Sequence, residues 1–304
     1  MFDYIEVFYN RGAAIRQQVG RVRQRSNERR LKRVTKPSTG SDQAQNREMD
    51  MSRLKCSAIL ALAVVFGIPA IVGGRLSAQS QSARVSVAGP RPLADAVLEL
   101  QQRHRWVITY EDTYRDYQGD LIDVTMSVHK KYDPKKPKIW MNPQRALVFE
   151  YPLSDTANPQ VVVTRLLEAY HAIDHGIYEY RLVADGTRLH IVPAASKNAQ
   201  GDFISRRSRF DTRVTIPEAE RSVAETVSLL VQAVNTASQT EIKVFVIPAN
   251  LFSRTMVRIG AQNEIARNVL VRALEATNRK VSWQLLCMGG SDSKNCGLSF
   301  VVVE

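Results

Sequence analysis

The sequence predicts an α+β protein made of two tandem small modules that follow an apolar N-terminal segment. Strand-like and helix-like patterns occur in one order, strand-helix-strand-strand-helix-strand-strand, and this order appears twice, over residues 79–197 and 210–304. The first helical pattern of each copy is also alike in letters: PLADAVLELQQ from Pro92 aligns with SVAETVSLLVQ from Ser222. A tandem of small modules is typical of proteins that bind and arrange partners.

The first module begins with an alternating strand at 84–88, and Gly89-Pro90 then turns the chain into the first helix. β-branched and aromatic residues predict the next strands, and an apolar stripe predicts the second helix. The Asp185-Gly186 pair is a strong signal for a tight turn between the two closing strands. The expected elements are a helix from Pro92, strands at 106–110 and 121–128, a helix at 159–171, and strands at 177–183 and 187–192.

The second module repeats this order after a polar, basic linker at 198–209, which we expect to let the modules move. Its second helix carries RALEA from Arg272, which aligns with RLLEA from Arg165 of the first module. The expected elements are strands at 211–216, 242–247, 256–259, 281–287 and 298–303, and helices at 221–237 and 263–278.

The first module is longer than the second between its third strand and its second helix. This insertion, at about 129–157, is rich in Pro and Lys, and a long segment of this kind is often functional or disordered. Trp140, Phe149 and Tyr151 lie within it, and we expect them to be exposed and to contact a partner.

An uncharged apolar run covers 56–74, with Arg53 and Lys55 before it and small residues near Ala78. Residues 51–78 therefore resemble a secretory signal peptide, and the alternative is an uncleaved membrane anchor. Both interpretations export the modules to the periplasm or beyond, because the basic flank stays in the cytoplasm. Residues 1–50 are basic, and we expect them to be disordered or to precede the true start codon.

Charge disfavours a nucleic-acid-binding role for the modules. The chain has a net charge of +12, but thirteen Lys and Arg against six Asp and Glu precede Cys56, which leaves +5 for everything after it. No dense basic stripe interleaved with aromatic residues appears in the repeated part. We therefore expect a protein partner in the cell envelope, no nucleic acid, and membrane contact through 56–74 if that segment is retained.

Cys287 and Cys296 flank a turn-rich segment between two strand-like runs. In an oxidising compartment these residues are expected to form a disulfide across the hairpin, and the alternative is two free thiols. A metal site is not expected, because two Cys without a nearby His or a second Cys pair do not close a coordination shell.

The segments PLADAVLELQQRHRWVITYED and VVVTRLLEAYHAIDHGIYEYRL resemble the short N-terminal domain shared by secretins and TonB-dependent receptors, here called the STN domain. Pro92, Leu93 and Ala96-Val97 match its first helix, and the second segment approximates the helix and hairpin that follow. The resemblance implies two helices between small mixed sheets, and docking to periplasmic partners. The repeated part is not followed by the alternating strands of a barrel or a secretin ring.

No catalytic constellation stands out, and we expect neither enzymatic activity nor a cofactor. His171 and His175 have a spacing that places two imidazoles on one metal, but they fall at a helix end before Gly176. Asp112, Asp116 and Asp120 lack the spacing of a calcium loop. The sequence therefore predicts an exported protein-protein adaptor, and the alternative is an exported hydrolase or metal-dependent enzyme that uses these residues.

Overall fold

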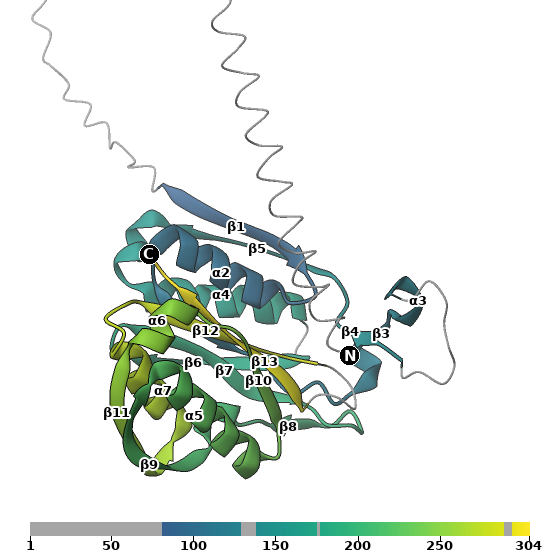
Figure 1. Cartoon of the computed structure of the whole chain (residues 1–304). Helices are drawn as coiled ribbons and strands as arrows, with labels where there is room; N and C mark the ends of the chain where they lie inside the picture. Colours follow the sequence, from purple (N-terminus) through teal and green to yellow (C-terminus); the bar gives the residue numbers. More distant parts are fainter. Residues whose placement is uncertain (1–80, 129–137, 175–176, 289–293) are drawn as a thin grey trace, which may run out of the picture. The chain divides into compact units, whose positions relative to one another are not determined.

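The structure is a computed structural model that describes residues 81–128, 138–174, 177–288 and 294–304, and it confirms the α+β class (Figure 1). The described residues belong to one unit that spans Gly74–Glu304. Within them, no helix is both long and apolar enough to cross a membrane. The expectations for 1–50, for the signal or anchor at 51–78, and for its apolar run at 56–74 fall outside the described residues.

The front half of this unit, residues 82–197, follows the expected order with one displaced strand. Its closing hairpin turns at Gly186, whose φ of 56° is in the left-handed region that glycine adopts without strain. The principal elements are β1 (Ser82–Gly89), α2 (Pro92–His104), β2 (Val107–Glu111), β5 (Arg145–Pro152), α4 (Pro159–Asp174), β6 (Tyr178–Asp185) and β7 (Arg188–Lys197).

The strand expected at 121–128 is wrong. Only Ile122–Asp123 (β3) is extended there, and it pairs with Trp140–Met141 (β4). The carboxylate of Asp123 accepts hydrogen bonds from the backbone N–H of Thr125, 3.0 Å away, and from its hydroxyl, 2.5 Å away. This local bonding starts the short helix α3 (Thr125–Val128) in place of a strand.

The third strand of the front half is instead β5, inside the segment that we expected to be an inserted loop. β5 pairs antiparallel with β1 along its whole length, from Gly89 opposite Arg145 to Ser82 opposite Pro152. Its side chains alternate between exposed and buried positions, as in a strand with one face on a core. The extra length of the front half therefore lies between β2 and β5. It contains η1 (Gln118–Asp120), β3, α3 and β4.

The back half, residues 213–302, has the same order of strands and helices. Its first helix begins with a capping box, in which Ser222 and Glu225 bond each other's backbone N–H groups. The elements are β9 (Arg213–Ser222), α5 (Val223–Ser238), β10 (Glu241–Val246), α6 (Ala249–Arg254), β11 (Met256–Ile265), α7 (Ala266–Glu275), β12 (Val281–Cys287) and β13 (Asn295–Val302).

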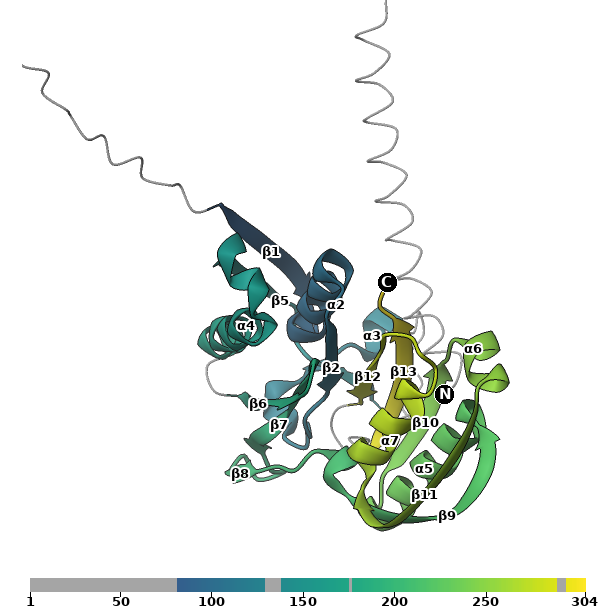
Figure 2. The same ribbon diagram turned by 90° about the vertical axis from the view of Figure 1, so that its left-hand side faces the viewer.

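Pairing follows the same scheme in both halves. The antiparallel pair β1–β5 corresponds to β9–β11, and the three strands β2-β7-β6 correspond to β10-β13-β12. In each triplet the first strand runs parallel to the second, and the second runs antiparallel to the third. The two triplets join through β12 and β2 into one sheet, in the order β10-β13-β12-β2-β7-β6, and Figure 2 shows this junction.

The helices of the two halves cover opposite faces of this sheet (Figure 1). In the β12–β2 pair, Gln284 lies opposite Tyr110 and Leu285 lies opposite Glu111. Gln284 donates a hydrogen bond to the carbonyl of Ala94 in α2, whereas Glu111 pairs with Arg267 in α7. Because neighbouring strand residues point to opposite faces, α2 and α4 lie on one side and α5 and α7 on the other.

The segment between the halves does not allow the movement that we expected. Residues Phe203–Ser205 (β8) pair with the end of β7, and both Ser208, the N-cap of the short helix Arg209–Asp211 (η3), and Arg209, its first residue, are buried. The two halves also share one sheet. The expectation of mobile modules is therefore wrong, because one continuous sheet joins the halves and the linker is buried at Ser208 and Arg209.

Candidate functional site

The junction between the halves is built from two consecutive acidic residues at the end of β2. The backbone N–H of Asp112 donates to the carbonyl of Leu285 in β12 over 2.8 Å, which extends the parallel pairing beyond Glu111. Both acidic side chains are fully buried. Since a buried carboxylate is costly unless it is paired, the surroundings of these two residues define the site.

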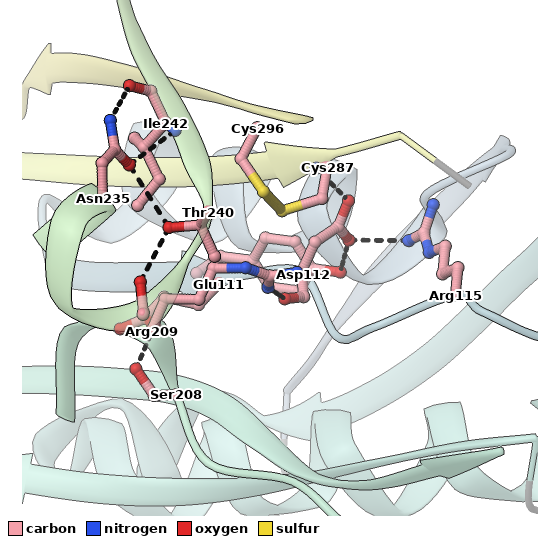
Figure 3. Close-up of a disulfide and its surroundings, with 12 residues drawn as sticks. Glu111, Asp112, Arg115, Ser208, Arg209, Asn235, Thr240, Ile242, Cys287 and Cys296 are labelled. Atoms are coloured by element: carbon pink, nitrogen blue, oxygen red, sulfur yellow. Dashed lines mark hydrogen bonds and ion pairs between the residues drawn. A yellow bond between two sulfur atoms is a disulfide. The ribbon is translucent and has the colours of Figure 1, made fainter. Parts of the chain in front are cut away.

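Asp112 accepts hydrogen bonds from four donors in three parts of the chain, and Figure 3 shows two of them, Arg115 and Cys287. Its Oδ1 accepts from the Tyr110 hydroxyl and from Arg115 Nη2, each at 2.6 Å. Its Oδ2 accepts from Arg91 Nε and from the backbone N–H of Cys287, each at 2.9 Å. Burial alone would raise the pKa of Asp112, but the charges of Arg115 and Arg91 outweigh it and lower the pKa.

Glu111 points to the other face and connects the front half to α7. Arg267 Nη2 lies 3.1 Å from Glu111 Oε1, and the Ser208 hydroxyl donates to Glu111 Oε2. Arg267 also donates to Ser208 Oγ over 2.7 Å and to Asp211 Oδ1 over 2.6 Å. Burial would lower the pKa of Arg267, but Glu111 and Asp211 raise it, so this cation stays charged.

Arg209 contributes a second buried cation to the junction. Its Nη1 donates to the backbone carbonyl of Asp112 over 3.0 Å, and its guanidinium lies 3.9 Å from the ring centroid of Tyr114. Burial lowers the pKa of Arg209. The guanidinium therefore ties the linker to the loop after β2 by a hydrogen bond and by a cation–π contact.

His190 of β7 is buried beside the same junction. Its Nδ1 lies 2.8 Å from the hydroxyl of Thr109, and its ring packs against Trp283 of β12 with centroids 5.3 Å apart. Burial, together with Arg267 and Arg188, lowers the pKa of His190 to about 3. The imidazole is therefore neutral at physiological pH and acts as part of the packed interior.

The expected disulfide between Cys287 and Cys296 is confirmed. The two residues are directly opposite each other in the β12–β13 pair, at the end of the hairpin. Both backbone polar groups of Cys287 take part in the junction. Its N–H donates to the Asp112 carboxylate, and its carbonyl accepts from Arg91 Nη2 over 2.6 Å. The disulfide thus fixes the hairpin where it meets the front half (Figure 3).

The expected exposure of Phe149 and Tyr151 is wrong. Their side chains are 6% and 0% exposed, because both point from β5 into the core of the front half. Tyr151 also shares a hydrogen bond of 2.5 Å with His104 of α2. Trp140 of β4 is half-buried, with Lys138 Nζ 5.7 Å from its ring centroid, and its contact with a partner stays a prediction.

The residues that we considered for metal or hydrolytic chemistry are spread over separate ion pairs. Asp112 binds Arg91 and Arg115, whereas Asp116 Oδ2 lies 2.6 Å from Arg206 and Asp120 Oδ1 lies 2.8 Å from Lys197. Nε2 of His171 accepts a hydrogen bond from the backbone N–H of Tyr180, and His175 lies outside the described residues. Among the described side chains, no group of three or more metal ligands comes together.

Sequence reasoning missed Glu111, Ser208, Arg209 and Arg267. The available signal was the pair Glu111-Asp112 directly after the apolar strand, since acidic residues at such a position need buried partners. Their partners could not be named, because Arg267 lies 156 positions further along the chain. Chemically, the junction holds each carboxylate with a cation and a hydroxyl group, which suits a rigid connection between the two halves.

Two strands of the large sheet, β10 and β6, form its ends among the described strands. On β10, the side chains of Phe245 and Val246 are 36% and 45% exposed, and Val301 of the neighbouring β13 is 38% exposed. Phe245 lies over Gly297, where an added Cβ would come within 2.1 Å of the ring. The Asn235 side chain bonds the backbone N–H and carbonyl of Ile242 on the outer side of β10, and no described strand pairs with that side. The β10 end therefore presents apolar side chains next to a strand edge, as protein-binding edges do.

Comparisons of this chain with protein-family models, with curated proteins and with solved structures find no match.

Proposed function

We propose that the chain is an exported, envelope-associated and non-enzymatic protein-protein interaction protein, made of two STN-like modules that bind a partner through a sheet edge. The observation that carries the proposal is the outer edge of β10, with which no described strand pairs and beside which apolar Phe245 and Val246 lie exposed. A strand from another protein gains main-chain hydrogen bonds at such an edge, and the apolar side chains add specificity.

Matching details in the two halves support two copies of one module. Gln101 in α2 donates to the carbonyl of Ile108 seven positions later, and Asn235 in α5 donates to the carbonyl of Ile242, also seven positions later. Both helices also end at a left-handed residue, Arg105 in α2 and Gln239 in α5. The same side-chain class thus bonds the first strand of each triplet at the same place.

The disulfide supports export. Cys287 and Cys296 are bonded, and such bonds persist mainly in oxidising compartments such as the periplasm or the extracellular space. Either a cleaved signal or a retained anchor at 51–78 delivers residues 79–304 to that side.

The titratable groups support a binding role over catalysis. Glu111 and Asp112 are sealed by cations, and His190 is neutral and packed against Trp283. A general base needs access to a substrate, and these three side chains are fully buried. They instead make the two modules one rigid unit, which presents its edges at low entropic cost.

The test is co-purification of tagged full-length chain from producing cells, with partners identified by mass spectrometry. We expect the Phe245→Glu variant to recover at least tenfold less of the partner than the wild type does. Leu229→Glu is the matched control, because Leu229 is equally exposed, at 37%, but lies on α5 away from the edge. Equal recovery with Phe245→Glu and with the wild type would refute binding at β10.

The segment between β2 and β5 needs a separate variant. Deletion of 129–157 would also remove β5 from the core, so its effect would report unfolding. Trp140→Ala removes the half-buried aromatic side chain of β4 and leaves β5 in place. If Trp140→Ala lowers the recovery of the partner and Phe245→Glu does not, the binding site lies in this segment and not at the β10 edge.

A further inference from the structure

The back half covers one surface of the front half. The back half has an equivalent surface of its own, and no described residue covers it. The pairing registers identify the counterparts directly. Ile108 and Thr109 of β2 lie opposite Leu189 and His190, just as Ile242 and Lys243 of β10 lie opposite Cys296 and Gly297. Val107, Thr109 and Glu111 therefore correspond to Glu241, Lys243 and Phe245.

These counterparts differ in burial. Val107, Thr109 and Glu111 are 6%, 0% and 0% exposed, because β12 and α7 of the back half lie against them. Glu241, Lys243 and Phe245 on β10 are all exposed. The same side of the same module is thus an interior in one copy and a surface in the other.

The strand that does the covering also has a free counterpart. In the back half, the outer hairpin strand β12 pairs with β2 of the front half. In the front half, the outer hairpin strand is β6, which forms the other end of the sheet. The backbone N–H of Tyr180 points away from β7 to His171, so the alternate residues Leu182 and Ala184 also direct their backbone groups outward.

The relation between the halves is a half-turn about an axis across the strands, combined with a shift along that axis. β10 and β13 run parallel, β12 runs opposite to them, and β2 runs parallel to β12. β2 therefore runs opposite to its counterpart β10, and the helices of the two halves lie on opposite faces. A relation of this kind does not close after one step, so it leaves one donor edge and one acceptor edge.

We propose that these two edges bind each other between copies of the chain, so that β6 of one copy adds in parallel to β10 of the next and continues the sheet. The front half of one copy then covers Phe245 and Val301 of the other, as the back half covers Glu111 and His190 within the chain. This inference rests on the proposed binding function and names its partner at β10 as a second copy. Because the contact is head to tail, it builds rings or filaments larger than dimers.

The test is sedimentation velocity of the purified full chain in a mild detergent over a hundredfold range of concentration. Phe245→Glu blocks the β10 edge, and Ala184→Pro blocks the β6 edge by removing an outward N–H, a position where an edge strand tolerates proline. Val183→Glu is a second β6 variant, should the proline disturb the fold. Leu229→Glu is the control, and circular dichroism confirms the folding of each variant.

We expect the wild type and Leu229→Glu to grow beyond the dimer with concentration, and each edge variant alone to stay monomeric. An equimolar mixture of Phe245→Glu and Ala184→Pro restores one free β6 and one free β10, so it should form a dimer and nothing larger. A monomeric wild type, a mixture that does not pair, or a β6 variant that still dimerises would overturn head-to-tail assembly. The wild type could also be monomeric while Phe245→Glu lowers the recovery of a different protein in the co-purification test. This result would overturn self-assembly and leave the proposed function intact.

Discussion

Glu111 and Arg267 form a buried ion pair between the two halves of the chain, with Oε1 and Nη2 3.1 Å apart. Their side chains are 1% and 8% exposed, and Ser208 of the linker bonds both of them. The pair joins the end of β2 to the start of α7, so three segments of the sequence meet at one polar cluster. Removal of one partner leaves a buried charge without compensation.

Arg267→Met is expected to lower the free energy of unfolding by about 3–5 kcal/mol, because Glu111 then stays buried without its cation. Urea denaturation followed by circular dichroism measures the change. Arg279→Met is the matched control, since Arg279 pairs with Glu304 at 3.4 Å on the surface, where such pairs contribute about 0–1 kcal/mol.

The double variant with Glu111→Gln should cost less than the sum of the two single changes, because the residues are directly coupled. Additive losses would show that Glu111 and Arg267 act independently and would contradict the role given to the pair.

His190 should make stability depend on pH between its unfolded and folded pKa values. In the folded chain burial lowers the pKa of His190 to about 3, whereas the unfolded imidazole titrates at about 6.5. Below pH 6.5 the unfolded chain binds one proton more than the folded chain. The free energy of unfolding therefore decreases as the pH is lowered, by up to about 1.4 kcal/mol per pH unit, until about pH 3. His190→Phe should flatten this slope in denaturation curves at pH 4 to 7, and equal slopes in both proteins would refute it.

Reduction of the Cys287–Cys296 bond should lower the free energy of unfolding by about 2–3 kcal/mol, the value expected for a short closed loop. Denaturation with and without dithiothreitol measures the loss. The double variant Cys287→Ser and Cys296→Ser should show the lower stability without any response to reductant. If reductant weakens the wild type and this variant equally, the disulfide is not the cause.

The N-cap of α5 offers a local test of the back half. Ser222 Oγ accepts from the backbone N–H of Glu225 over 3.2 Å, so Ser222→Ala should cost about 1 kcal/mol in urea denaturation. Ser228→Ala, at an exposed position within the same helix, should be neutral or slightly stabilising because alanine favours helices. A Ser222→Ala loss no larger than that of Ser228→Ala would contradict the capping role.

Local patterns in the sequence predicted most of the secondary structure. The apolar spacing of Leu93, Val97 and Leu100 predicted α2, and Asp185-Gly186 predicted the β6–β7 hairpin. These elements follow from contacts between near neighbours. The prediction of a strand at 121–128 failed because the Asp123 side chain bonds the backbone N–H of Thr125. This local hydrogen bond outweighs the preference of the β-branched residues for a strand.

The pairing of strands that are far apart in the chain could not be predicted from the sequence. β5 was missed because its partner β1 lies more than fifty residues earlier in the chain, and Pro and Lys nearby made its alternation inconspicuous. The junction was missed for the same reason, since β2 and β12 are far apart in the sequence and the cations that pair with Glu111 and Asp112, namely Arg91, Arg115 and Arg267, come from three different segments. The hairpin disulfide was predictable, because Cys287 and Cys296 are separated by only 9 positions.

The most direct measurement of the central claim is site-specific photo-crosslinking in living cells, with a benzoylphenylalanine residue at position 245 on β10 or at position 229 on α5. Binding at the uncovered sheet edge predicts a covalent adduct with another protein chain from position 245 and none from position 229, whose exposure is nearly the same. Adducts of equal yield at both positions, or none from position 245, would contradict the claim that the chain acts through this edge.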